Sequence, residues 1–191
     1  MGEEAPIVVG VSGASGAPIA VRVLQALHAA KVPVALVVSK GAVAVLREEC
    51  DLTPEALTPY ATVRYSDDDL GAPIASGSRP TRGMVVVPCS GNTVAHLALG
   101  LADTLLTRSA QVHLKERRRL IVVPRESPLP TLLLRHLTTL SELGVVVLDA
   151  APPYYLHPRS VDDLTAYLAG KVLDQFGVPH QLYRGWKSEG A

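Results

Sequence analysis

The chain has 191 residues, a length that fits one ordinary domain with a full hydrophobic core. Its 18 Lys and Arg residues balance its 18 Asp and Glu residues, so no overall charge favours nucleic acid or an acidic membrane surface. Aromatic residues make up only 4% of the sequence, which further disfavours binding of single-stranded nucleic acid.

The two cysteines, Cys50 and Cys89, lie far apart and lack the ligand spacing of a zinc site. Such sparse cysteine usage is typical of a reducing compartment, so we expect a cytoplasmic protein without a metal. The first residues are acidic and polar, and the apolar runs are too short to cross a bilayer. We therefore expect neither a signal peptide nor a membrane span.

Short runs of β-branched residues alternate with helical patterns along the chain. The predicted strands are residues 6–11, 32–39, 84–89, 120–124 and 145–150. The predicted helices are residues 19–30, 42–49, 94–106, 129–143 and 161–176. Strands that are apolar throughout indicate a parallel sheet covered on both faces, so the pattern predicts a doubly wound, three-layer α/β domain over residues 1–191.

Two segments fall outside this alternation. Residues 51–82 are rich in proline and predict a long irregular excursion from the domain. Residues 178–191 form a largely polar tail that contains Tyr183 and Trp186. We expect this tail to pack on a neighbouring subunit or to fray.

The first predicted strand leads into "GVSGASGAP", residues 10–18, where no side chain is larger than that of Val11. Small residues let backbone amides approach a ligand, and the amino end of the following helix favours an anion such as phosphate. The glycine spacing differs from the dinucleotide fingerprint, and the second strand ends in Ser39-Lys40 instead of an acidic residue. These features favour a mononucleotide such as FMN over NAD, with a simple tight turn as the alternative.

Two further strand ends place polar residues on the same carboxyl edge of the sheet. After the third strand, "PCSGNTVAHLA" puts Ser90 and Thr93 at the start of a helix, where capping is the simpler explanation. The fourth strand leads to Arg125 and Glu126, a charged pair that is difficult to explain as core. Just before that strand, "RSAQVHLKERRRL" is rich in cations and predicts either a solvated helix end or a local phosphate pocket.

Together, these residues resemble the UbiX-type flavin prenyltransferases, a family of flavodoxin-like flavoproteins. The stretches that carry the resemblance are "GVSGASGAP", "VVSKGA" with Glu49 downstream, "IASGS", "GMVVVPCS", "LLTRSAQVHLKERR", "VPRESPL" and "PPYYLHP". They occur in the family's order and span nearly the whole chain. The resemblance implies a flavodoxin-like fold and a homo-oligomer, usually a dodecamer, with active sites between subunits.

The same resemblance implies a reaction. A dimethylallyl group passes from dimethylallyl phosphate to N5 and then C6 of reduced FMN. The prenylated FMN that results serves a partner decarboxylase of the UbiD type. No metal is required if side chains stabilise the charge that develops on the leaving phosphate.

The resemblance also implies roles for individual residues. The expected FMN-binding residues are Gly13, Ala14, Ser15, Ser39, Ser90, Gly91, Asn92, Thr93 and Arg125. The donor phosphate is expected to bind Arg108, Lys115, Tyr155 and Lys171. The expected catalytic residues are Glu126 as the principal acid or base, Glu49 as a second one, Lys115 as a cationic donor, and Ser15 near flavin N5.

The chain departs from the family's usual pattern at several positions. Lys171 replaces an arginine, which keeps the charge but loses the planar two-pronged donor, so weaker donor binding is expected. Ile19 and Ala20 stand where the first helix usually carries an aromatic residue, and "SAQV" replaces the common "AADV". In the helix after "PRESPL", Leu133 and His136-Leu137 replace the usual His and Asn-Met.

Two other functions remain open from the sequence. One is a flavin-dependent cysteine decarboxylase on the same scaffold, although such enzymes use an early catalytic histidine and the first helix here offers only His28. The other is a non-catalytic FMN-binding subunit, which would bind the flavin without turning it over.

Overall fold

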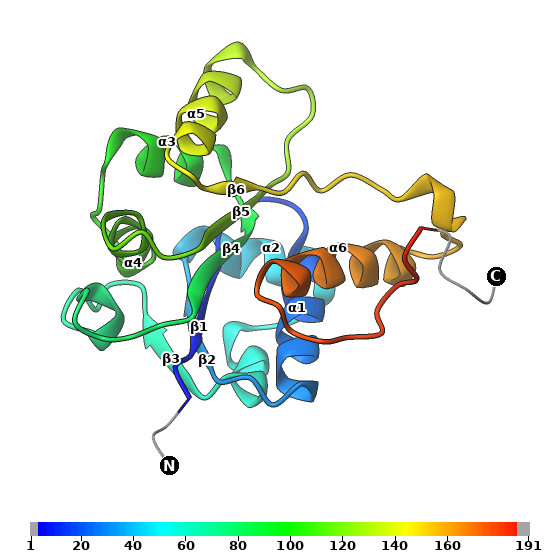
Figure 1. Ribbon diagram of the computed structural model, residues 1–191, viewed down its shortest axis with the longest axis horizontal. Helices are drawn as coiled ribbons and strands as arrows, with labels where there is room; N and C mark the ends of the chain where they lie inside the picture. The colour runs from blue at the N-terminus through cyan, green and yellow to red at the C-terminus, as the bar shows by residue number, and fades with distance from the viewer. Residues whose placement is uncertain (1–3, 187–191) are drawn as a thin grey trace.

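Parallel strands form the central sheet of the computed structural model, which describes residues 4–186 (Figure 1). The strands are β1 (Ile7–Val11), β2 (Val34–Val38), β3 (Val63–Ser66), β4 (Gly83–Cys89), β5 (Leu120–Pro124) and β6 (Val146–Val147). They pair in the order β3-β2-β1-β4-β5-β6, and every pairing is parallel. Without the edge strand β3, this is the flavodoxin-like order, so the predicted doubly wound α/β fold is confirmed.

Helices cover both faces of the sheet, as Figure 1 shows. One face carries α1 (Ala17–Ala29), α2 (Lys40–Cys50) and α6 (Val161–Gln175). The other carries α3 (Gly91–Leu99), α4 (Leu105–Lys115) and α5 (Thr131–Glu142). Short 3-10 helices are η1 (Pro54–Tyr60), η2 (Pro73–Ala75) and η3 (Tyr154–Leu156). None of the helices between residues 4 and 186 has the length and apolar character that crossing a bilayer requires.

Burial explains why the strands were readable as continuous apolar runs. Every residue of β1, β4 and β5 is buried, because helices cover the sheet on both sides. Side chains on one face pack into a cluster with α1 and α6, and those on the other face pack with α3, α4 and α5. These two cores hold the strand ends, and therefore the loops of the site, in fixed positions.

Two predicted elements were wrong. The predicted irregular segment 51–82 contains β3, a short strand that the sequence concealed because its residues are mostly exposed at the sheet edge. The predicted helix 94–106 is two helices, because Gly100, with a φ of 75°, ends α3 and a new helix begins at Leu105. The cationic stretch 108–120 therefore begins inside α4.

The topology opens the carboxyl edge of the sheet between β1 and β4. These strands are neighbours, but α1 leaves β1 toward one face while α3 leaves β4 toward the other. The divergence creates a crevice at this edge, the usual ligand position in open α/β sheets. A Cβ atom on Gly13 would lie 2.9 Å from the carbonyl carbon of Gly41, so only glycine permits the loop after β1 to approach α2.

Ser12 connects the two loops on either side of this crevice. Its side chain is 2% exposed, and its hydroxyl donates a hydrogen bond to the Pro88 carbonyl over 2.9 Å. The same hydroxyl oxygen accepts a hydrogen bond from the Ser90 amide over 2.8 Å. One small polar side chain therefore fixes the spacing of the loops after β1 and β4.

We expect Ser12→Ala to destabilise the fold by about 1–3 kcal/mol, because it leaves a buried amide without its acceptor. Urea unfolding followed by circular dichroism measures this difference. Ser141→Ala, at an exposed position of α5, is the matched control and should change the free energy of unfolding by less than about 0.5 kcal/mol. Equal stabilities of the Ser12 and Ser141 variants would contradict the role given to Ser12.

Candidate active site

A hollow of about 370 Å³ lies at the carboxyl edge between the amino ends of α2 and α3. Five of the predicted FMN-binding residues line it, namely Gly13, Ser39, Ser90, Asn92 and Thr93. The Ser39 hydroxyl accepts the Ala42 amide over 3.3 Å, and the Ser90 hydroxyl accepts the Thr93 amide over 3.2 Å. Both serines therefore cap helices, as the simpler explanation required for Ser90, and both also border the hollow.

The donor set of this hollow fits a phosphate and a polyol chain. Helix amino ends present backbone amides and a positive dipole end, and those of α2, α3 and α4 border the hollow here. Asp67 also lines it, but its carboxylate accepts the Leu106 amide over 2.9 Å at the start of α4. The Asp68 carboxylate is paired with Lys40 at 3.1 Å. These two acidic side chains of the hollow thus have partners within the chain.

The amino end of α1 has a different occupant from the one that the sequence suggested. The Glu49 carboxylate, at the end of α2, accepts the amides of Gly16 and Ala17 over 2.8 and 2.9 Å. These are the amides that the loop "GVSGASGAP" was expected to offer to a phosphate. Because a carboxylate of the chain itself already takes them, the expectation of a phosphate at this helix end was wrong.

The surroundings of Glu49 keep it ionised. Partial burial raises the pKa of its carboxyl, but hydrogen bonds from the Ser15 side chain and from the two α1 amides outweigh this effect. The positive charge of Arg125 acts in the same direction, so the pKa lies below its usual value. Glu49 is therefore a carboxylate at neutral pH, able to accept a proton but not to supply one.

A second hollow, of about 310 Å³, lies on the other side of the same loop. Ser15, Glu49 and Arg125 contribute its polar side, and Ile19 of α1 and Leu168 of α6 are among the apolar residues that line it. The Arg125 Nε atom donates to the Ser15 carbonyl over 3.3 Å, which joins the loop after β5 to the loop after β1. An apolar wall with a polar edge that holds a guanidinium, a carboxylate and a hydroxyl suits a flat ring that carries polar atoms along one side.

Glu126 directly follows Arg125, which lines this second hollow, and it is exposed on the loop after β5. Its carboxylate accepts the amide of Ser127 over 3.1 Å. Glu49 is exposed as well, but its carboxylate is held by two amides of the α1 amino end. The two predicted acid-base residues therefore sit in different environments, one held against a helix end and one open to an incoming group.

Tyr155 and Lys171, two of the predicted phosphate ligands, belong to one continuous cluster along α6. Tyr155 lies in η3, is 41% exposed and packs edge to face against Trp186, with ring centroids 5.1 Å apart. It is also hydrogen-bonded to Tyr167 on α6. Lys171 lies one turn further along the same helix, which places both predicted ligands on one side of the molecule.

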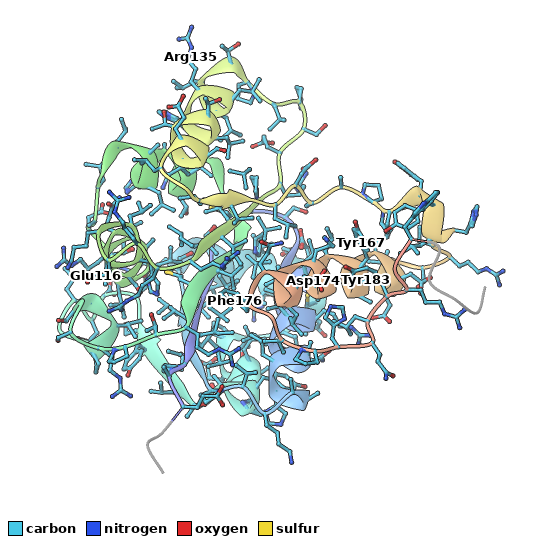
Figure 2. All side chains as sticks on the ribbon, viewed as in Figure 1. Glu116, Arg135, Tyr167, Asp174, Phe176 and Tyr183 are labelled. Carbon is cyan, nitrogen blue, oxygen red and sulfur yellow. The ribbon has the colours of Figure 1, made fainter. Side chains whose placement is uncertain are left out.

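Arg108 and Lys115, the other two predicted phosphate ligands, lie on α4, across the sheet from α6. Lys115 forms an ion pair with Glu116, and the Arg108 Nε atom donates to the Ala75 carbonyl over 3.1 Å. Figure 2 shows Glu116 and Asp174 on opposite sides of the sheet. A single chain therefore does not bring all four predicted phosphate ligands together.

A third hollow, of about 1010 Å³, lies between α2, η1 and β3. None of the predicted site residues lines it, and ion pairs of Lys40 with Asp68 and of Arg64 with Glu55 lie along it. Its size alone does not make it the active site, because the convergent donors lie elsewhere. Among the residues that shape the crevice, sequence reasoning missed Ser12, whose burial within a run of small residues no local pattern reveals.

Comparison with known proteins agrees with this geometry. Residues 1–171 match the family described as Flavoprotein. The chain is 49% identical over 180 residues to the flavin prenyltransferase UbiX of Thermoplasma acidophilum, an alignment that covers 94% of this chain and 99% of that protein.

Two solved structures are also closely similar. AnUbiX (PadA1), crystallised with FMN and dimethylallyl pyrophosphate, superposes with a TM-score of 0.95 at 37% identity and covers 98% of this chain and 100% of its own. A dodecameric FMN-dependent UbiX-like decarboxylase from Escherichia coli O157:H7 gives a TM-score of 0.93 at 41% identity, covering 96% and 100%. Full-length agreement in both sequence and structure places the chain in the Flavoprotein family, among the UbiX-type flavin prenyltransferases.

Proposed function

We propose that the chain transfers a dimethylallyl group from dimethylallyl phosphate to N5 and C6 of reduced FMN. One observation carries this proposal: two hollows, one polar and one largely apolar, flank the single loop of residues 12–16 at the sheet edge. The hydroxyls and helix ends of the first hollow suit the phosphate and ribityl chain. The apolar wall of the second, together with Arg125, suits the flavin ring. The likeness to a relative crystallised with FMN and a dimethylallyl donor supports this assignment.

When bound, reduced FMN supplies the nucleophilic N5 and C6 atoms of the reaction. The residues of the chain then have three tasks. Ser39, Ser90 and Thr93, which line the first hollow, would hold the flavin phosphate end. Arg125 and Ser15, which line the second, would hold the ring, with Ser15 acting near N5. Orientation of the acceptor in this way lowers the barrier because the reacting atoms meet in a fixed geometry.

The donor side requires positive charge. Departure of the phosphate leaves negative charge on its oxygens, which cations and hydroxyl donors stabilise most strongly where water is excluded. Tyr155 of η3 supplies one hydroxyl and Lys171 of α6 one ammonium, both from the same side of the molecule. Arg108 and Lys115 supply the remaining cations, and their place on the opposite face means that a neighbouring copy of the chain provides them.

We infer from this arrangement that the active enzyme is a homo-oligomer, and that a dodecamer like that of the UbiX-like relative fits it. The prenylated flavin then passes to a decarboxylase of the UbiD type. Both the reducing-compartment composition and the flavin chemistry fit a cytoplasmic location.

Glu126 is the principal acid-base residue in this proposal. Closing the new ring at C6 releases a proton, and the exposed carboxylate of Glu126, which follows Arg125 of the second hollow, would accept it. Glu49 is engaged by the two α1 amides, so its first role is to hold the loop that carries Ser15. Proton transfer at Glu49 would be a secondary role.

Glu126→Gln should slow formation of prenylated FMN by about a hundredfold or more, because general acid-base residues typically contribute factors of 10²–10⁴. The assay incubates reduced FMN and protein with dimethylallyl phosphate without oxygen and follows the flavin by mass spectrometry. Glu142→Gln, at an exposed position of α5, is the matched control and should retain full activity. An unalkylated flavin from the native protein, with both phosphate and pyrophosphate donors, would contradict the proposed function itself.

Two variants test whether a neighbouring copy completes the site. An assembly made only of the Lys115→Ala variant, or only of the Lys171→Ala variant, should have strongly reduced activity. Co-assembled in equal amounts, they should recover about a quarter of native activity, because that share of sites holds both lysines if each site draws them from different copies. No recovery on mixing would contradict the shared site, because it would show that both lysines of a site come from the same chain.

A further inference from the structure

The segment that follows α6 folds back onto the helix that carries Lys171. A Cβ atom on Gly170 would lie 2.6 Å from the ring of Tyr183 and 2.9 Å from the ring of His180. Glycine at this helical position therefore makes room for the returning segment. Figure 2 shows Tyr167, Asp174 and Tyr183 gathered along α6, where this segment passes. The predicted packing of residues 178–191 on a neighbour stays a prediction; residues 178–186 pack on their own chain, and 187–191 lie outside the described residues.

Asp174 is the centre of the contacts that this segment makes. The Tyr183 hydroxyl donates to one of its carboxylate oxygens, and His180 Nε2 lies 3.1 Å from the other. His180 Nδ1 accepts the Leu182 amide over 3.2 Å, which leaves Nε2 as the nitrogen that bears hydrogen. A neutral His180 can therefore donate to Asp174. Two donors from the returning segment thus hold one carboxylate on α6.

The same carboxylate faces Lys171. The Lys171 ammonium lies 3.4 Å from the Asp174 oxygen that Tyr183 also contacts. Direct hydrogen bonds between an ammonium and a carboxylate are usually about 2.7–2.9 Å long. Lys171 therefore makes a long contact with Asp174 that orients the ammonium, and its other N–H groups remain available to an incoming phosphate.

The Asp174 carboxylate is ionised when it orients Lys171. Partial burial raises the pKa of Asp174, but hydrogen bonds from Tyr183, His180 and Lys171 and the charge of Lys171 outweigh it, so the pKa lies below its usual value. The charge that orients Lys171 is thus fully present at neutral pH.

The returning segment also contacts the second phosphate ligand of this side. The Tyr183 ring packs on the ring of Tyr167 at a centroid distance of 4.9 Å, and Tyr167 is hydrogen-bonded to Tyr155. Tyr183 therefore connects Asp174, which faces Lys171, with Tyr167, which holds Tyr155. Both predicted ligands rest on the same support.

We propose that Asp174 and Tyr183 are positioning residues that set the geometry of Lys171, and through Tyr167 that of Tyr155, for the phosphate of the dimethylallyl donor. This inference rests on the proposed function, in which Lys171 and Tyr155 bind that phosphate. It gives residues 178–186 a task in donor recognition. It also offers a reason why a lysine serves at position 171, because a single ammonium needs an external group to direct it, whereas an arginine fork carries its own geometry.

Tyr183→Phe removes the hydroxyl and keeps the ring. We expect it to raise KM for dimethylallyl phosphate about fivefold, with kcat and the affinity for FMN nearly unchanged, because it acts on ground-state binding of the donor. In a Lys171→Ala background the same change should leave KM unaltered, since it then has no ammonium to direct. Tyr60→Phe, which removes a hydroxyl from η1 beside His28, is the matched control and should behave as the native protein.

Each other outcome is decisive. An unchanged KM in Tyr183→Phe, with the native protein active, would overturn the positioning role while leaving the proposed function intact. A fivefold rise in both the native and the Lys171→Ala backgrounds, accompanied by a lower melting temperature, would show a purely structural role and would also overturn it. A native protein that alkylates no flavin would remove the proposed function, and this inference with it.

Discussion

The divergence of α1 and α3 from two neighbouring strands is the constraint on which the rest of the molecule depends. Because β1 and β4 are adjacent while their helices pack on opposite faces, the carboxyl edge must open between them. The hydroxyl of Ser12 fixes how far it opens, and the two hollows form on either side of the loop that it anchors. The fold thus determines where a flavin can lie before any residue specifies it.

Much of this arrangement could be predicted from the sequence, for a physical reason. Strands buried on both faces must be apolar throughout, so β1, β4 and β5 are legible as runs of Val, Ile and Leu. The exposed strand β3 has no such requirement and was missed. Likewise, Gly100 ends α3 and Thr104 caps α4, but these two signals lie inside one apolar stretch, so the break between the helices was missed.

The sequence predicted which residues belong to the candidate site better than it predicted which of them lie close together. Ser39, Ser90 and Thr93 were placed correctly at one edge because parallel strands present all their carboxyl ends there. The contact of Glu49 with the start of α1 joins residues 33 positions apart, and no local pattern predicts it. The separation of Lys115 from Lys171 follows from which face each helix takes, a choice that neither helix encodes in its own residues.

Gly170 lowers the intrinsic stability of α6, and contacts with its surroundings offset this loss. A glycine inside a helix lowers stability by about 1 kcal/mol relative to alanine, and α6 carries this weakness at its centre. The rings of Tyr183 and His180 cover that point, so the helix and the segment that returns over it support each other. Loss of residues 178–186 would therefore loosen the middle of α6, so this segment is part of the framework that supports the helix.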